Sequence, residues 1–203
     1  MKSKRLFATF LIVFALCFSL AVSAAADGSY TVVSGDSLWK IAAKNQVGVS
    51  ELIVANPQLR NPDLIYPGDK ILIPSVSASV REYEKEVVRL VNVERAKYGL
   101  GALTENWELS RIARYKSQDM HDVGYFSHTS PTYGSPFTMI KNFGLTYRSA
   151  GENIAYGYRT PSDVVTGWMN SPGHRANILN GSFKQIGVGY VADGNYWTQM
   201  FIG

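Results

Sequence analysis

The stretch IGVGYVADGNYWTQMFI at residues 186–202 decides the fold class of the larger part of this chain. Both of its ends are rich in β-branched and aromatic residues, which favour strands. Between them lies Asp193-Gly194-Asn195, a typical hairpin turn because glycine adopts positive φ angles at little cost. We therefore predict two antiparallel strands, at residues 186–191 and 196–202.

Helical periodicity precedes this hairpin. Residues 83–98 repeat apolar side chains at helical spacing and end at Gly99, a common helix stop. Thr104 can cap a second helix, and Thr160 with Pro161 can begin a third. One face of the second helix is formed by Leu109, Ile112, Ala113, Lys116 and Met120. Helices followed by a hairpin predict an α+β domain with helices packed on an antiparallel sheet.

Several segments of this domain form a recognisable series: LVNVERAKYGLGAL at 90–103, Phe126-Ser127-His128, GENIA at 151–155, WMNSPGHRANILN at 168–180, and IGVGY with YWTQMF at the end. In this order they resemble the CAP superfamily, also called the SCP or pathogenesis-related-1-like family. The resemblance implies an α-β-α sandwich. Members of the family have been linked to sterol or lipid binding, to interference with other proteins, to ion-channel effects and to proteolysis.

The same resemblance implies a cleft that joins His128, Glu152 and His174. Two imidazoles and a carboxylate could bind a divalent metal such as zinc, with His128 and His174 as ligands. Glu152 would then be the candidate base of a hydrolase. The chain departs from the family pattern at Ser171, where a second acidic residue is expected three positions after Trp168. This departure argues against an enzymatic function more than against a binding function. A binding function would require no cofactor.

A structural role for the same residues stays open. Ser171-Pro172 resembles a helix start, so His174 could simply pack and hydrogen-bond there. Glu152 and Asn153 could satisfy backbone groups of a loop. The walls of the cleft could be held together by Arg175 and Asn177.

Residues 30–74 form a smaller unit with the predicted order strand, helix, helix, strand. Tyr30 to Val33 and Lys70 to Ile73 are the β-rich ends. Ser37 can cap a first helix, and Ser50 a second one that stops at Asn56-Pro57.

This unit, YTVVSGDSLWKIAAKNQVGVSELIVANPQLRNPDLIYPGDKILIP, resembles a LysM domain over its whole length. The resemblance implies binding of an N-acetylglucosamine glycan such as peptidoglycan between two loops. By position the loops are Gly35, Asp36, Ser37 and Leu38 on one side and Pro62, Asp63, Leu64 and Ile65 on the other. Turn geometry, capping and core packing are the alternative roles of these residues.

The N-terminal residues 1–26 are predicted to be a cleaved export signal. Lys2, Lys4 and Arg5 precede 17 uncharged residues and then a run of small residues. Cys17, the only cysteine, lies within the signal, so the exported chain would have no disulfide. Removal of the apolar signal segment would also leave the chain without a membrane span. The remaining charge is 17 Lys and Arg against 16 Asp and Glu, since three of the 20 positive residues lie in the signal. We expect no nucleic-acid partner.

The predicted organisation is therefore a signal at 1–26, a LysM domain at 29–74, a linker at 75–80 and a CAP domain at 81–203. We expect a secreted protein of the cell wall or spore envelope that binds peptidoglycan through the LysM domain and presents the CAP domain to a protein or lipid ligand. A LysM-targeted, metal-dependent hydrolase and a lipid- or sterol-binding protein are the alternatives.

Overall fold

The structure is a computed structural model that describes residues 26–203. Apart from Ala26, the predicted signal segment lies outside these residues. Within residues 26–203, no helix has both the length and the apolar character needed to cross a bilayer.

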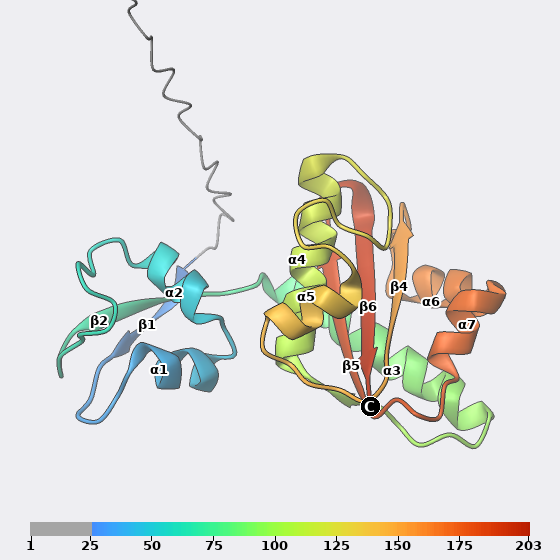
Figure 1. The fold of residues 1–203 in the computed structure, drawn as a ribbon, viewed down its shortest axis with the longest axis horizontal. Coiled ribbons are helices and arrows are strands. Elements are labelled where there is room, and N and C mark those ends of the chain that lie inside the picture. Colours follow the sequence, from blue (N-terminus) through green and yellow to red (C-terminus); the bar gives the residue numbers. More distant parts are fainter. Residues whose placement is uncertain (1–25) are drawn as a thin grey trace, which may run out of the picture.

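The small unit has the βααβ order that the sequence predicts (Figure 1). Strands β1 (Ala26–Thr31) and β2 (Lys70–Pro74) pair antiparallel, and helices α1 (Leu38–Asn45) and α2 (Val49–Ala55) connect them. The Ser37 side chain accepts a hydrogen bond from Lys40 N and so caps α1 as expected. The core of the unit consists of Val32, Leu38, Ile41, Ala42, Leu52 and Ile71.

Two details of this unit differ from the prediction. The first strand ends at Thr31 rather than Val33, because the backbone N–H of Val33 donates to the Asp36 carboxylate and turns the chain. The second helix is capped by Gly48 and not by Ser50, whose hydroxyl donates instead to Glu51 within the helix.

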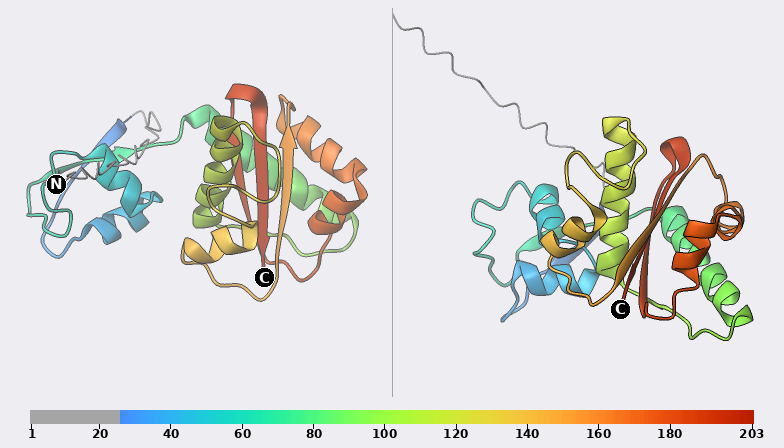
Figure 2. Two further views of the ribbon diagram at one scale, coloured as in Figure 1. Left: turned by 45° about the horizontal axis from the view of Figure 1, so that its top comes forward. Right: turned by 45° about the vertical axis from the view of Figure 1, so that its right-hand side comes forward.

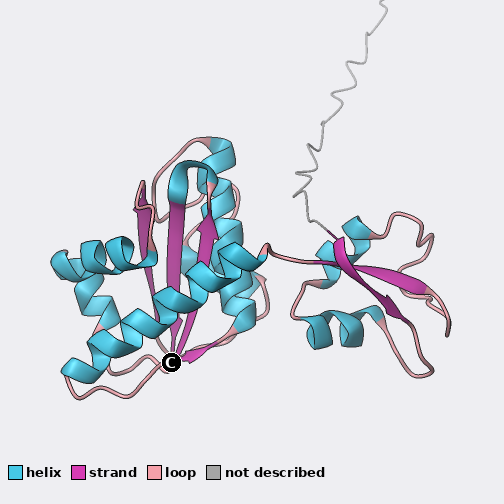
Figure 3. Cartoon of the chain, turned by 180° about the vertical axis from the view of Figure 1, so that it is seen from behind, coloured by secondary structure: helices cyan, strands magenta, loops and turns pink. Residues whose placement is uncertain are grey.

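The large unit is a sheet between two layers of helices (Figures 2 and 3). The strand order is β3 (Thr104–Glu105), β5 (Gln185–Val191), β6 (Tyr196–Ile202) and β4 (Ala150–Tyr156). Only the β3–β5 pair is parallel. Helices α3 (Ala78–Lys97), α6 (Pro161–Asn170) and α7 (Pro172–Ile178) cover one face. Helices α4 (Trp107–Val123) and α5 (Pro136–Asn142) cover the other. The predicted α-β-α sandwich is thus the observed fold.

Glycines decide how closely α4 approaches the sheet. Along β5, Gly187 and Gly189 face α4 while Ile186, Val188 and Tyr190 belong to the core on the opposite face. A Cβ atom on Gly187 would lie 2.3 Å from the backbone of Leu109, and one on Gly189 would lie 2.1 Å from Arg114 N. The alternation of glycine with large side chains in β5 therefore fits a helix backbone directly onto a strand.

Three expectations for this unit need correction. Thr104 belongs to strand β3 because its N–H donates to Lys184 O, and the cap of α4 is Asn106. Helix α3 begins at Ala78, capped by Ser77, so it takes up half of the segment 75–80 expected to be a linker. Glu152 and Asn153, whose alternative role assumed a loop, lie in strand β4.

Candidate functional site

Two residues of the predicted cleft, His128 and Glu152, are in contact at the edge strand β4. Glu152 lies in this strand with its side chain 1% exposed, and His128 lies in the loop between α4 and α5 with its side chain 55% exposed. His128 Nδ1 and Glu152 Oε1 are 2.7 Å apart. The second oxygen, Oε2, is buried and has no hydrogen-bond partner among the described residues. A buried carboxylate with one free oxygen is a group that a ligand could bind, because an unpaired buried acceptor is costly.

A buried lysine holds the His128 loop in place. Lys116 of α4 donates to the carbonyl oxygens of Ser127 and His128, at 2.7 and 3.0 Å, and to the hydroxyl of Tyr125 at 3.1 Å. Its side chain is buried. Asp119, also in α4, accepts hydrogen bonds through its carboxylate from Tyr125, Ser130 and Thr132 of the same loop. The loop that carries His128 is therefore tied to α4 by two charged side chains.

His174 approaches the site from α7, on the other side of β4. Asn153 donates to His174 O, and Asn177 donates to Glu152 O and to Asn153 Oδ1. These bonds fix α7 against β4. Asn177 thus has the wall-holding role considered for it, whereas Arg175 stacks on Tyr98 and donates to its hydroxyl.

The pKa values of His128, His174 and Glu152 depart from their ordinary values for different reasons. The hydrogen bond with Glu152 raises the pKa of His128. Burial lowers the pKa of His174, and the positive charge of His128 adds to that effect. Burial raises the pKa of Glu152, against the hydrogen bond from His128 and the charge of Lys116.

Among residues 26–203, the suggested zinc ligands His128 and His174 belong to no group of three or more His, Cys, Asp or Glu side chains arranged to hold a metal ion. His128 Nδ1 is hydrogen-bonded to Glu152, so only its Nε2 remains as a metal ligand. The ammonium group of Lys116 acts on the Glu152 carboxylate electrostatically. A nearby positive charge opposes the binding of a divalent cation.

The two loops predicted to bind glycan differ in accessibility. Leu38 is buried in the core of the small unit, and Ile65 packs against that core. Asp36 accepts hydrogen bonds from Tyr30 and Val33 and so stabilises the first loop. Gly35 and Ser37 belong to the same first loop. In the second loop, Pro62 is half-buried. Asp63 and Leu64 are exposed, and Leu64 lines a hollow between α2 and β2. A ligand would contact side chains mainly on the second loop.

Sequence reasoning placed Lys116 on an apolar helical face and gave it no role. A lysine in an otherwise apolar stripe was the available signal, because such a group is buried only when its charge finds partners.

An α-β-α sandwich with a histidine–glutamate pair at its edge strand, preceded by a βααβ unit, defines the class of protein as a LysM–CAP protein. The chain belongs to the CAP family, the cysteine-rich secretory protein family, whose sequence profile matches residues 88–201. The LysM domain profile matches residues 30–74.

Three of the similar proteins come from bacilli. The chain is 60% identical over 129 residues to the uncharacterized protein YkwD of Bacillus subtilis, which covers 64% of this chain and 50% of YkwD. It is 49% identical over 53 residues to the spore coat assembly protein ExsA of Bacillus cereus, 26% of this chain and 8% of ExsA. An extracellular SCP-domain protein of Bacillus anthracis has a similar structure, with a TM-score of 0.59 and 30% identity over 67% of this chain and 47% of that one. The chain spans half the length of these relatives or less.

Proposed function

We propose that this is a secreted protein of the cell wall or spore envelope whose LysM domain binds peptidoglycan through its N-acetylglucosamine glycan. The observation that carries the proposal is the complete LysM unit at residues 30–74, with an exposed second loop beside a hollow. The likeness to a spore coat assembly protein supports a place in the envelope.

In this proposal the CAP domain presents a site for a protein or lipid ligand. The site is the edge of β4, where Glu152 Oε2 is buried and has no partner among the described residues. We favour ligand binding over hydrolysis because the site has a single carboxylate, with Ser171 in place of a second acidic residue. Without that second carboxylate the site has one fewer candidate for general acid–base catalysis.

Sedimentation with purified peptidoglycan tests the LysM part of the proposal. The protein comprising residues 27–203 is expected to sediment with the wall, and Leu64→Asp is expected to reduce the bound fraction strongly. Val54→Asp is the matched control, because Val54 on α2 is 69% exposed and Leu64 is 52% exposed. The proposal fails if the wild-type protein stays in the supernatant or if both variants lose binding equally.

The same sedimentation assay tests the hydrolase alternative when the supernatant is analysed for released fragments. Release of muropeptides or peptide fragments that disappears in His128→Ala and His174→Ala would replace the binding function by an enzymatic one. Binding to the wall without release of fragments supports the proposed binding function.

A further inference from the structure

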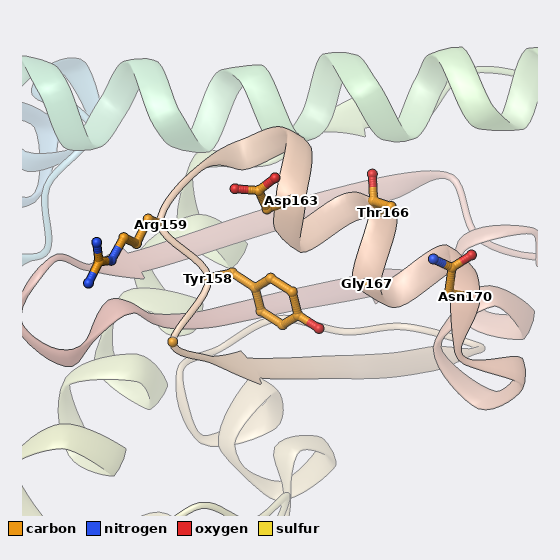
Figure 4. A pocket seen from close by; sticks show the side chains of 7 residues that line it. Tyr158, Arg159, Asp163, Thr166, Gly167 and Asn170 are labelled. Carbon is orange, nitrogen blue, oxygen red and sulfur yellow. The ribbon is translucent and has the colours of Figure 1, made fainter.

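A polar groove runs along α6 on the CAP domain, away from the His128–Glu152 pair. Figure 4 shows Asp163, Thr166 and Asn170 in succession along the helix, with the Tyr158 side chain beside it. The groove has a volume of about 540 Å³ and is open to solvent. This volume lies within the usual range for small-molecule sites, about 300–1,000 Å³.

The Tyr158 ring lies against the helix at a position without a side chain. A Cβ atom on Gly167 would lie 2.5 Å from the Tyr158 hydroxyl oxygen and 2.6 Å from Cζ. The Tyr158 backbone is fixed as well, because Trp197 Nε1 donates to Tyr158 O at 2.7 Å. Tyr158 as a whole residue is nevertheless 39% exposed. It therefore presents a fixed aromatic surface to solvent, which loses little conformational entropy when a ligand binds.

The polar groups of the groove are suited to a neutral, hydroxyl-rich ligand. Arg159 and Asp163 have opposite charges, so the groove has no net charge. Within residues 26–203, the side chains of Thr166 and Asn170 form no hydrogen bond, and they offer a hydroxyl and an amide. From Asp163 to Asn170 the helix rises about 10 Å, which is roughly the length of a disaccharide.

Two further exposed aromatic residues lie at the end of β4, where Tyr156 contacts the loop that follows α4. Gly157, which lines the groove, connects Tyr158 to Tyr156, and Tyr156 contacts Phe126 at a ring-centroid distance of 6.3 Å. Both Tyr156 and Phe126 are more than half exposed. Flat aromatic rings with polar groups beside them fit the alternating apolar faces and hydroxyl edges of pyranose rings.

We propose that this groove is a second carbohydrate-binding site, which takes a disaccharide segment of the N-acetylglucosamine glycan. This inference rests on the proposed function, since the ligand is the polymer bound by the LysM domain. Only Ser75 to Ser77 separate β2 from α3. The LysM domain contacts α4, which covers the sheet face opposite α6, so one glycan strand must extend around the CAP domain to occupy both sites. Two weak sites on one polymer bind more tightly than either alone.

The test is an NMR titration of the ¹⁵N-labelled protein, residues 27–203, with the tetramer of N-acetylglucosamine. Amide signals of residues 157–170 are expected to shift in addition to those of residues 30–74. Saturation of the LysM signals with no shift in residues 157–170 would overturn the second site. The absence of shifts in residues 30–74 would contradict the LysM proposal, while shifts in residues 157–170 would still support the groove.

Two variants test the role of the ring. Tyr158→Ala is expected to weaken binding at residues 157–170 by about 3- to 10-fold. Gly167→Ala should weaken it similarly, because the added methyl group displaces the ring, while alanine favours the helix. Phe137→Ala is the control, since Phe137 on α5 is 46% exposed and does not line the groove. Equal effects of all three, or shifts that appear with a wall stem peptide and not with the sugar, would refute a carbohydrate site.

Discussion

Nε of Arg111 lies 2.5 Å from Oε1 of Glu51, and this ion pair joins the CAP domain to the LysM domain. Arg111 belongs to α4 and Glu51 to α2. The guanidinium group also lies over the rings of Tyr115 and Phe143, at 5.7 and 5.3 Å from their centroids. Both charged side chains are largely shielded from solvent. Together with the short connection after β2, this contact holds the two domains in one relative orientation.

Arg111→Ala is expected to loosen the two domains without unfolding either of them. A partly buried, charge-assisted contact of this kind contributes about 1 kcal/mol. Spin labels at Val54→Cys and Val123→Cys would report the interdomain distance, because both positions are exposed. The distance distribution should broaden in Arg111→Ala. Arg89→Ala, which breaks an exposed pair within α3, should leave the distribution unchanged, and an unchanged distribution in both variants would refute the contact.

The same contact should depend on pH. Burial would raise the pKa of Glu51, but the hydrogen bond and the charge of Arg111 hold it below its ordinary value of 4.5. A depressed carboxyl pKa stabilises the docked state above 4.5, and this stabilisation is lost as the pH falls through the lowered value. The spin-label distribution of the wild-type protein should therefore broaden only below pH 4.5. Broadening that begins near neutral pH would contradict this assignment.

His128 and His174 should titrate on opposite sides of the ordinary histidine value of 6.5. The pKa of His128 is raised, so the stabilisation from its pair with Glu152 is complete below pH 6.5 and is lost as the pH rises through the raised value. NMR titration of the imidazole signals measures both values. Glu152→Gln should lower the pKa of His128.

His121 is the internal control for that titration. Its pKa is raised mainly by a hydrogen bond with Asp122, and Asp193 contributes as well. Glu152→Gln should therefore leave the pKa of His121 unchanged. A wild-type His128 that titrates below 6.5 would show that the carboxylate does not stabilise its charged form.

Sequence patterns predicted the parts of the fold that depend on local burial. The face of α4 from Leu109 to Met120 is buried as its periodicity indicates, because a helix repeats its contacts every three or four residues. Its cap was wrongly assigned to Thr104, since Thr104 pairs with a strand about 80 residues further along the chain. No local pattern contains that long-range pairing.

The candidate site, too, could be predicted only in part from the sequence. The resemblance placed His128, Glu152 and His174 near one another, and the structure brings His128 and Glu152 into contact. Side-chain directions in the site depend on the backbone positions of the His128 loop and of α7, which Lys116 and Asn177 hold through bonds to Ser127 O and Glu152 O. Residue types in a motif do not determine such directions.

Lys116→Met is expected to destabilise the protein by about 2–4 kcal/mol. The variant keeps the length of the side chain but leaves the partly buried carbonyl groups of Ser127 and His128 without their charged donor. Urea unfolding measures the change in the free energy of unfolding. Lys85→Met is the control, because Lys85 is exposed and pairs only with Glu82, and it should change stability by less than about 0.5 kcal/mol. Equal effects of the two variants would show that Lys116 is not a structural cation.

Arg95 should stabilise α7, which carries His174, as Lys116 stabilises the loop that carries His128. Its buried guanidinium group donates to Gly101 O, Ile178 O and Asn180 O, at 2.9, 2.7 and 2.9 Å. These bonds tie the end of α3 to the end of α7. Arg95→Met should cost about 3 kcal/mol, since three carbonyl groups lose a charged donor. Hydrogen exchange should accelerate at residues 172–178 more than at β5. Uniform acceleration across the domain would instead show that Arg95 stabilises the fold as a whole and does not act on α7 in particular.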